Sequence, residues 1–147
     1  MRVETSKYAG QYLKKLALSE GNFYFFKDFI VGELNHGVHF TYEKGKVLID
    51  EVYNFYGQDV NVSYISNRVN SYSVHAQDWL KFYKERHHID SYAIVAYNKI
   101  GLMNVMLEKL FSQARMRKFG VLDDAVNWVM KFYAEKEAVS KESDSIK

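Results

Sequence analysis

The stretch SYAIVAYN, residues 91–98, decides the fold of this chain. Its centre is apolar without interruption, a pattern that is typical of a strand covered on both faces. Such strands belong to parallel sheets, in which helices form the crossover connections and cover the sheet. The segments on either side of residues 91–98 are therefore expected to supply helices.

Helical and strand-like segments do alternate along the chain. A helix is predicted between the candidate N-cap Thr41 and Gly57, where apolar residues recur at helical spacing. A second helix is predicted around residues 79–86, with Ser71 or Ser73 as its N-cap. The other expected elements are strands at 12–18, 23–34 (bent near Lys27–Asp28), 60–66 and 115–120, and helices at 102–114 and from Asp123 onwards.

This order predicts a single α/β domain over residues 1–136. Alternation of strands and helices indicates a mostly parallel sheet with right-handed crossovers, and the first strands indicate an antiparallel opening. We expect a mixed sheet of about four to six strands with about four helices. Residues 137–147, EAVSKESDSIK, are polar and are expected to form a disordered tail.

Composition excludes several classes of protein. The net charge of +2 over 147 residues is too small to predict nucleic-acid binding, which needs a concentrated basic face. No apolar run is long enough to cross a bilayer, the N-terminus lacks the apolar core of a signal peptide, and the absence of cysteine excludes disulfides and zinc–thiolate sites. We therefore expect a cytoplasmic protein. The twelve Tyr, ten Phe and two Trp indicate an aromatic core, or else an aromatic pocket or interface.

Polar residues are concentrated in YISNRVNSYSVHAQDW, residues 64–79, between two apolar elements. We interpret this segment as a loop that recognises a partner or an anion, in which Arg68 could engage a carboxylate or phosphate. Residues of the next parallel strand end should lie nearby, because binding sites of open α/β sheets lie beyond the carboxyl ends of the strands. The candidate site comprises Asn67, Arg68, Asn70, Ser71, Tyr72, Ser73, His75, Asn98 and Lys99. The alternative is that these side chains cap the helix and their own turns.

Catalytic and metal-binding patterns are weak. His36 and His39 are spaced poorly for a closed metal site, and the adjacent His87 and His88 suit a helix end. His75 follows Ser71 and Ser73, but Asp78 is the only nearby acid that could orient it, and the chain has neither a nucleophile elbow nor a phosphate-binding loop. We expect no enzyme activity, no metal and no cofactor.

The order of elements and the closing FGVLDDAVNWV, residues 119–129, resemble the STAS domain, named for sulfate transporters and anti-sigma-factor antagonists. The segments YISNRVNSYSV, DWLKFYKER and GLMNVMLEKLF are similar to those of small stand-alone bacterial SpoIIAA-like proteins. The resemblance extends over residues 23–132 and implies a STAS-like binding domain. In this family a Ser or Thr in an Asp-Ser-Ser-Gly motif is phosphorylated and controls binding to a kinase. Asn70-Ser71-Tyr72-Ser73 occupies that place but differs at three positions, and Ser71 and Ser73 are the candidate phosphoacceptors.

Two functions follow from these observations. The first is a non-enzymatic regulatory or protein-interaction module that binds an unknown protein through residues 66–75, with homodimerisation through the opening strands as a further candidate. The second is a carrier or sensor of a small hydrophobic or lipid ligand. Met103, Met106 and Phe111 could line its pocket beside the helix at 100–114, although that apolar stripe is more simply explained as core.

Overall fold

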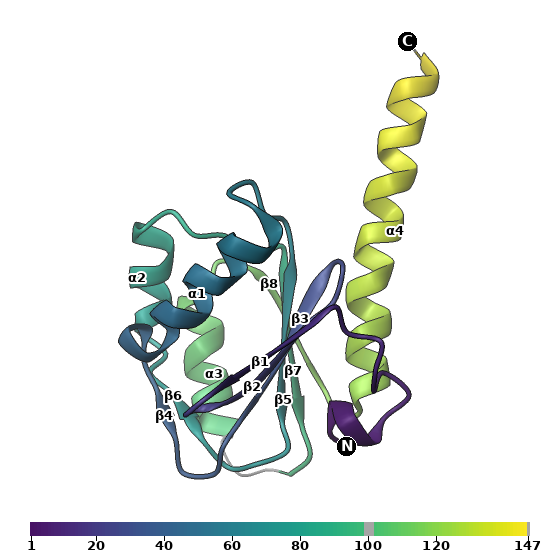
Figure 1. Cartoon of the computed structure of the whole chain (residues 1–147). Helices are drawn as coiled ribbons and strands as arrows, with labels where there is room; N and C mark the ends of the chain where they lie inside the picture. Colours follow the sequence, from purple (N-terminus) through teal and green to yellow (C-terminus); the bar gives the residue numbers. More distant parts are fainter. Residues whose placement is uncertain (99–101, 147) are drawn as a thin grey trace.

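The computed structural model describes residues 1–98 and 102–146, and within them the chain forms three layers. A mixed six-stranded sheet separates α1, α2 and α3 on one face from α4 on the other (Figure 1). The predicted α/β class with an antiparallel opening is confirmed. The helices are α1 (Tyr42–Tyr56), α2 (Asp78–Lys84), α3 (Leu102–Phe111) and α4 (Leu122–Ile146), after a short 3-10 turn η1 (Val3–Thr5). The strands are β1 (Lys14–Leu18), β2 (Gly21–Phe25), β3 (Phe29–Leu34), β4 (His39–Phe40), β5 (Ser63–Arg68), β6 (Ser73–Val74), β7 (Ser91–Ala96) and β8 (Arg115–Phe119).

The large sheet has the order β1-β2-β3-β5-β7-β8. The pairs β1–β2 and β2–β3 are antiparallel, whereas β3–β5, β5–β7 and β7–β8 are parallel. The segment SYAIVAYN therefore supplies β7, which lies between β5 and β8 and is buried along almost its whole length. Helices cover both faces of this strand, as its apolar pattern predicts.

The predicted bent strand at 23–34 is two strands. The chain reverses at residues 26–28, and the Phe26 N–H donates to the Phe29 carbonyl at 2.9 Å. The Phe26 and Phe29 rings stack at 4.6 Å across this turn. The turn residues Lys27 and Asp28 indicate a bend in the sequence, but the Gly or Asn that usually marks a hairpin is missing, so a reversal is not predicted.

The predicted helix start at Ser71 or Ser73 is wrong. Ser73 and Val74 form β6, which pairs with β4 in a separate small parallel sheet, and α2 begins only at Asp78. β5 likewise runs from Ser63 to Arg68 rather than from 60 to 66. Residues 66–75 therefore form a strand end and a paired loop, and the expected anion-binding helix terminus does not exist there.

The bounds of α1 were predicted correctly because its ends carry local signals. The Thr41 hydroxyl accepts a hydrogen bond from the Lys44 N–H at 3.3 Å, which caps the first turn. Gly57 ends the helix with φ of 95°, a conformation that glycine adopts without a steric penalty.

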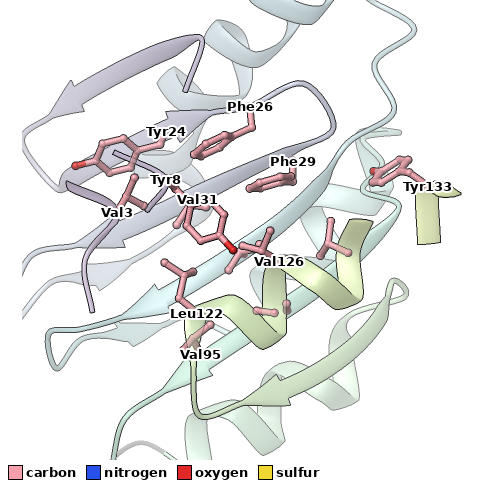
Figure 2. Close-up of a cluster of buried hydrophobic side chains, with 14 residues drawn as sticks. Val3, Tyr8, Tyr24, Phe26, Phe29, Val31, Val95, Leu122, Val126 and Tyr133 are labelled. Atoms are coloured by element: carbon pink, nitrogen blue, oxygen red, sulfur yellow. The ribbon is translucent and has the colours of Figure 1, made fainter. Parts of the chain in front are cut away.

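The core on the α4 face is built from aromatic and β-branched side chains. Figure 2 shows the α4 residues Leu122 and Val126 pointing toward Val31 and Val95 of the sheet, with the rings of the opening hairpin beside them. Tyr133 closes this core, and its hydroxyl contacts Ser63 at 3.0 Å and donates to Asp90 at 2.9 Å. The aromatic load of the sequence is thus partly explained by this face of the sheet.

The second half of α4 extends beyond the sheet (Figure 1). Residues 134–141 are exposed, and the helix continues to Ile146 through the segment that the sequence predicts to be a disordered tail. No helix in the described part of the chain is both long and apolar enough to cross a membrane.

Gly32 in β3 makes room for a large ring of the next strand. A methyl group at Gly32 would collide with the Tyr64 hydroxyl and would lie 3.1 Å from the Phe23 ring. We predict that Gly32→Ala lowers the free energy of unfolding by about 1–3 kcal/mol, because the added atom overpacks a filled site. Urea unfolding measures this change.

Gly120→Ala is the matched control, since nothing lies within 4 Å of a methyl group there, and it should change stability by less than about 0.5 kcal/mol. Adding Tyr64→Phe to Gly32→Ala should recover part of the loss. An unchanged unfolding midpoint for Gly32→Ala would show that the Tyr64 ring is not held against the strand.

Candidate functional site

A cavity of about 160 Å³ lies between the sheet and the helices α1 and α2. Its floor includes Ile30, Val62, Tyr64 and Tyr92, which point from β3, β5 and β7 and from the end of the α1–β5 connection. Its other walls come from α1, from α2 and from the residues that flank α2. The lining is almost entirely apolar and unusually aromatic, with Phe40, Tyr42, Tyr53, Tyr64, Trp79, Phe82 and Tyr92.

The cavity lies where two core clusters meet without filling the space. One cluster holds α1 against the opening strands through Phe25, Ile30 and Leu48. The other holds α3 against β7 through Ile94 and Val105. α2 lies over the gap between them, but it has seven residues and none is fully buried, so it covers the gap without filling it.

The walls of the cavity are not those expected from the sequence. None of the residues of α3 that the structure describes lines it. Instead α3 turns its apolar stripe to solvent: Met103, Met106 and Leu110 are 69%, 62% and 76% exposed, whereas Glu108 is fully buried. The interpretation of that stripe as core is therefore wrong, since one charged residue faces inward in place of the methionines.

α1 and α2 are joined by polar contacts beside the cavity. The imidazole of His87, just after α2, lies between two α1 hydroxyls, with Nε2 3.1 Å from Tyr42 and Nδ1 2.6 Å from Tyr53. The first residue of α2, Asp78, accepts a hydrogen bond from the Tyr42 N–H at 2.8 Å and so caps α1. These contacts fix the position of α2 relative to α1.

Burial in this joint shifts the pKa of each of its ring groups. Burial lowers the pKa of His87, and the nearby carboxylates Glu85 and Asp50 only partly oppose this effect. Burial also raises the pKa of Tyr42 and Tyr53, so both hydroxyls stay protonated at neutral pH. The joint is therefore a neutral imidazole between two neutral phenols.

Two polar groups of the cavity lining have no partner among the described residues. The indole N–H of Trp79 is buried and has no acceptor. The Tyr64 hydroxyl, which lies against Gly32, makes no hydrogen bond within the described part of the chain, but it is not one of the fully buried groups. Burial raises the Tyr64 pKa well above its usual value, so the group stays a neutral phenol. The unsatisfied Trp79 N–H is unusual in a native protein.

Arg68 lies beside the cavity and is bound mainly inside the protein. Its guanidinium forms an ion pair with Glu108, and it also donates to Ser66 at 3.1 Å and to the Tyr92 hydroxyl at 3.2 Å. The Tyr92 hydroxyl in turn donates to Glu108 at 2.7 Å. The Tyr72 hydroxyl bonds to Ser66, and the Tyr72 ring lies 5.3 Å from the guanidinium. The Nε and Nη2 donors of Arg68 are therefore taken up inside the protein.

The electrostatics of this network agree with a permanent charge pair. Burial alone would lower the pKa of Arg68, but Tyr92 and Glu108 beside the guanidinium reverse that effect and raise it. Burial is the main reason that the pKa of Tyr92 and Tyr72 is also raised. Arg68 is therefore charged, and both tyrosines are neutral, at any physiological pH.

Asn67 points to the opposite face of the sheet, as strand alternation requires. Its amide donates to the Glu33 carboxylate at 2.7 Å and to the Met1 carbonyl at 2.8 Å, and it accepts from the Tyr97 hydroxyl at 2.6 Å. Glu33 also accepts from the Val3 N–H at 2.8 Å. These bonds hold the N-terminal segment against the sheet, so Asn67 has a structural role.

The remaining candidate residues are divided between the interior and the surface. The Asn70 amide donates to the Leu34 carbonyl and accepts from Arg2, and the Ser73 hydroxyl contacts His39 at 2.6 Å. Ser71, His75 and Asn98 are exposed. Arg68 of β5 is the register partner of Ala96 of β7. Asn98 follows two residues later, so it lies at the same end of the strands as Arg68, as expected. Lys99 lies outside the described residues.

The serine and histidine pairs of this loop do not form a catalytic triad. Ser73 contacts His39, whereas the acid Asp78 lies 4.0 Å from the other histidine, His75. No group of three His, Asp or Glu side chains in the described ranges is arranged to hold a metal ion.

Reasoning from the sequence missed Glu33, Glu108 and the cavity between α1 and α2. Glu33 could have been noticed, because it interrupts an otherwise apolar strand, whereas Glu108 stands next to Lys109 and gives a weaker signal. The cavity has no signal in the sequence, since it depends on how far apart two core clusters lie.

Comparison with known proteins does not assign this chain to a family. No description of a protein family, no curated protein and no solved structure matches this chain. The resemblance to STAS and SpoIIAA-like proteins therefore stays a prediction.

The buried ion pair gives a prediction for stability. Arg68→Ala should lower the free energy of unfolding by about 3–5 kcal/mol, because it leaves the Glu108 carboxylate buried without a cation. Lys109→Ala removes an exposed cation next to Glu108 and should change stability by less than about 0.5 kcal/mol. Chemical denaturation compares the two variants, and equal effects would contradict the assigned role of Arg68.

The joint between α1 and α2 gives a prediction for pH. The lowered pKa of His87 means that the unfolded chain binds a proton more readily than the folded chain. The contribution of His87 is therefore complete above the unfolded pKa of about 6.5 and is lost as the pH falls below it. When the pH is lowered from 7 to 5, the unfolding midpoint of the wild type should decrease. The decrease should be smaller in His87→Gln. Identical pH dependence of the two proteins would exclude this role.

Proposed function

We propose that this protein is a non-enzymatic binding domain that carries or senses one small hydrophobic molecule in the cavity between the sheet, α1 and α2. The observation that carries the proposal is a partly open apolar pocket with a volume of about 160 Å³. Its walls leave apolar and aromatic surface in contact with water, although burial of such surface is favourable. A ligand that fills the pocket would remove this surface from water.

The size of the cavity limits the ligand. Sites for drug-sized molecules are typically about 300–1,000 Å³, whereas an engineered apolar cavity of about 150 Å³ in another protein stays dry and binds benzene or xenon. The cavity here falls in the second class. A molecule of that size fits, and a long acyl chain does not.

The covering helix offers a route of entry. α2 has no fully buried residue, and its Leu80 and Lys81 are exposed. Elements with few buried contacts open at low free energy. The pocket is already partly open, and displacement of α2 would widen it without disturbing the sheet.

The proposal is tested by filling the cavity from within. Val52 lines it from α1, so Val52→Phe should occupy part of the space and abolish binding of xenon and benzene. For the wild type, benzene at ten times its dissociation constant should raise the free energy of unfolding by about 1.4 kcal/mol. Thermal unfolding and amide NMR shifts measure both effects.

Val47→Phe is the matched control, because Val47 lies on the same helix but is exposed. It should retain binding of both probes. Absence of any binding by the wild type, or equal binding by Val52→Phe, would reject the proposal.

A second proposal, a protein-interaction module, is supported by the outer face of α3. Met103, Met106, Leu107 and Leu110 are exposed at i, i+3, i+4 and i+7, the spacing with which one helix packs against another. The Asn104 amide joins this helix to the candidate loop, since it donates to the Val74 carbonyl at 2.8 Å and accepts from the Val74 N–H at 2.9 Å. A second copy of α3 is the simplest partner with a matching stripe.

This second proposal predicts a dimer that Met106→Glu with Leu110→Glu converts to a monomer, because charges in an apolar contact are costly. Met130→Glu is the control, since Met130 is exposed on α4 at the opposite face of the sheet. Size-exclusion chromatography with light scattering gives the mass of each protein. A monomeric wild type at high micromolar concentration would reject self-association through α3.

A further inference from the structure

The chemistry of the cavity walls restricts the ligand further, if the proposed binding function holds. We infer that the ligand is a neutral molecule with a single aromatic ring and one small hydrogen-bonding substituent, and that this substituent pairs with the Tyr64 hydroxyl. Three features of the walls lead to this chemistry.

The first feature is the aromatic character of two adjoining walls. Tyr64 and Tyr92 supply rings from the sheet, while Trp79 and Phe82 supply rings from α2. The Trp79 ring lies 5.0 Å from that of Tyr92 at 49°, and the Tyr64 and Tyr92 rings lie 5.9 Å apart. Tilted and edge-to-face arrangements of this kind favour a further aromatic ring beyond its simple burial. A saturated ring of equal size gains burial alone.

The second feature is the absence of a permanent cation and of an unpaired carboxylate from the described part of the lining, whose other titratable side chains are histidines and tyrosines. No Lys or Arg is among the described residues that line the cavity. The one carboxylate of the lining, Asp78, already accepts from the Tyr42 N–H and lies 3.5 Å from Lys81. Arg68 lies behind the Tyr92 hydroxyl and is neutralised by Glu108. A charged ligand would lose its hydration without gaining a counter-ion, so a neutral one is favoured.

The third feature is one polar group at an apolar site. The Tyr64 hydroxyl can both donate and accept, it belongs to a lining residue, and it has no hydrogen bond within the described residues. The Trp79 N–H also lacks an acceptor, but it is fully buried and is not accessible from the cavity. The Ser66 and Tyr92 hydroxyls are both occupied by the Arg68 network. One oxygen or nitrogen on the ligand is therefore matched by the Tyr64 hydroxyl.

Three small probes separate these features without any change to the protein. Phenol carries the ring and the hydroxyl, benzene carries the ring alone, and cyclohexanol carries the hydroxyl on a saturated ring. Isothermal titration should show phenol binding more tightly than either of the others, by roughly 2- to 12-fold over benzene, which is the value of one ordinary hydrogen bond.

Tyr64→Phe tests the assigned hydrogen bond. It should weaken phenol binding by the same roughly 2- to 12-fold and leave benzene binding unchanged, because only the hydroxyl is removed. Tyr12→Phe is the matched control: it removes a hydroxyl from a tyrosine that packs against the core on the α4 face and does not line the cavity, so it should leave the preference for phenol intact. Circular dichroism establishes that each variant is folded.

Tryptophan fluorescence locates the bound probe. The chain has two tryptophans, and Trp128 packs against Phe119 on the α4 face. In a Trp128→Phe background, emission therefore reports on Trp79 alone. Phenol should change this emission with the dissociation constant found by titration, and Val52→Phe should abolish the change.

The outcomes distinguish this inference from the function on which it rests. Equal binding of phenol and cyclohexanol, or loss of both phenol and benzene binding in Tyr64→Phe, would overturn the aromatic ligand and its hydrogen bond but leave a hydrophobic-ligand site. Failure of all three probes to bind the wild type would overturn both.

Discussion

The buried ion pair between Arg68 and Glu108 is the interaction on which the rest of the structure depends. Glu108 is the fully buried charge of α3, and Arg68 lies at the end of β5, next to the central strand β7. A buried carboxylate is tolerated only with a cation and additional hydrogen bonds, and Arg68 and Tyr92 supply both. The rotation of α3 about its own axis is therefore set by charge and not by its apolar stripe.

Two consequences follow from that rotation. The methionines and leucines of α3 face solvent, where they form an apolar surface of a kind that monomeric proteins seldom expose. The hydroxyls of Ser66, Tyr72 and Tyr92 are meanwhile taken up around Arg68. The side of the cavity nearest the ion pair thus has no open polar group, and the unpaired groups lie on Tyr64 and Trp79. The polar network and the apolar cavity are two parts of one arrangement.

The polar segment at residues 66–75 serves mainly to hold the molecule together. Strand alternation sends Asn67 to one face, where it fastens the N-terminal segment, and Ser66 and Arg68 to the other. The loop beyond them pairs with β4 and is fastened to α3 by Asn104. Polar side chains at the end of a buried strand must find partners, and here most find them inside the chain.

The sequence alone determined the architecture. Three signals are sufficient to predict an α/β domain with a mixed sheet: the apolar strand at 91–98, the alternation of strand-like and helical hydrophobic patterns, and local signals such as Thr41 and Gly57. Each of these signals depends only on residues that are neighbours in the sequence. The tertiary structure decided the rest. Whether Arg68 meets a partner or meets Glu108, which face of α3 is buried, and whether a void remains between two clusters all depend on residues distant in sequence. Charge pairing across 40 positions and the spacing of packed layers leave no periodic trace in a chain, so the candidate site became visible only when the layers were assembled.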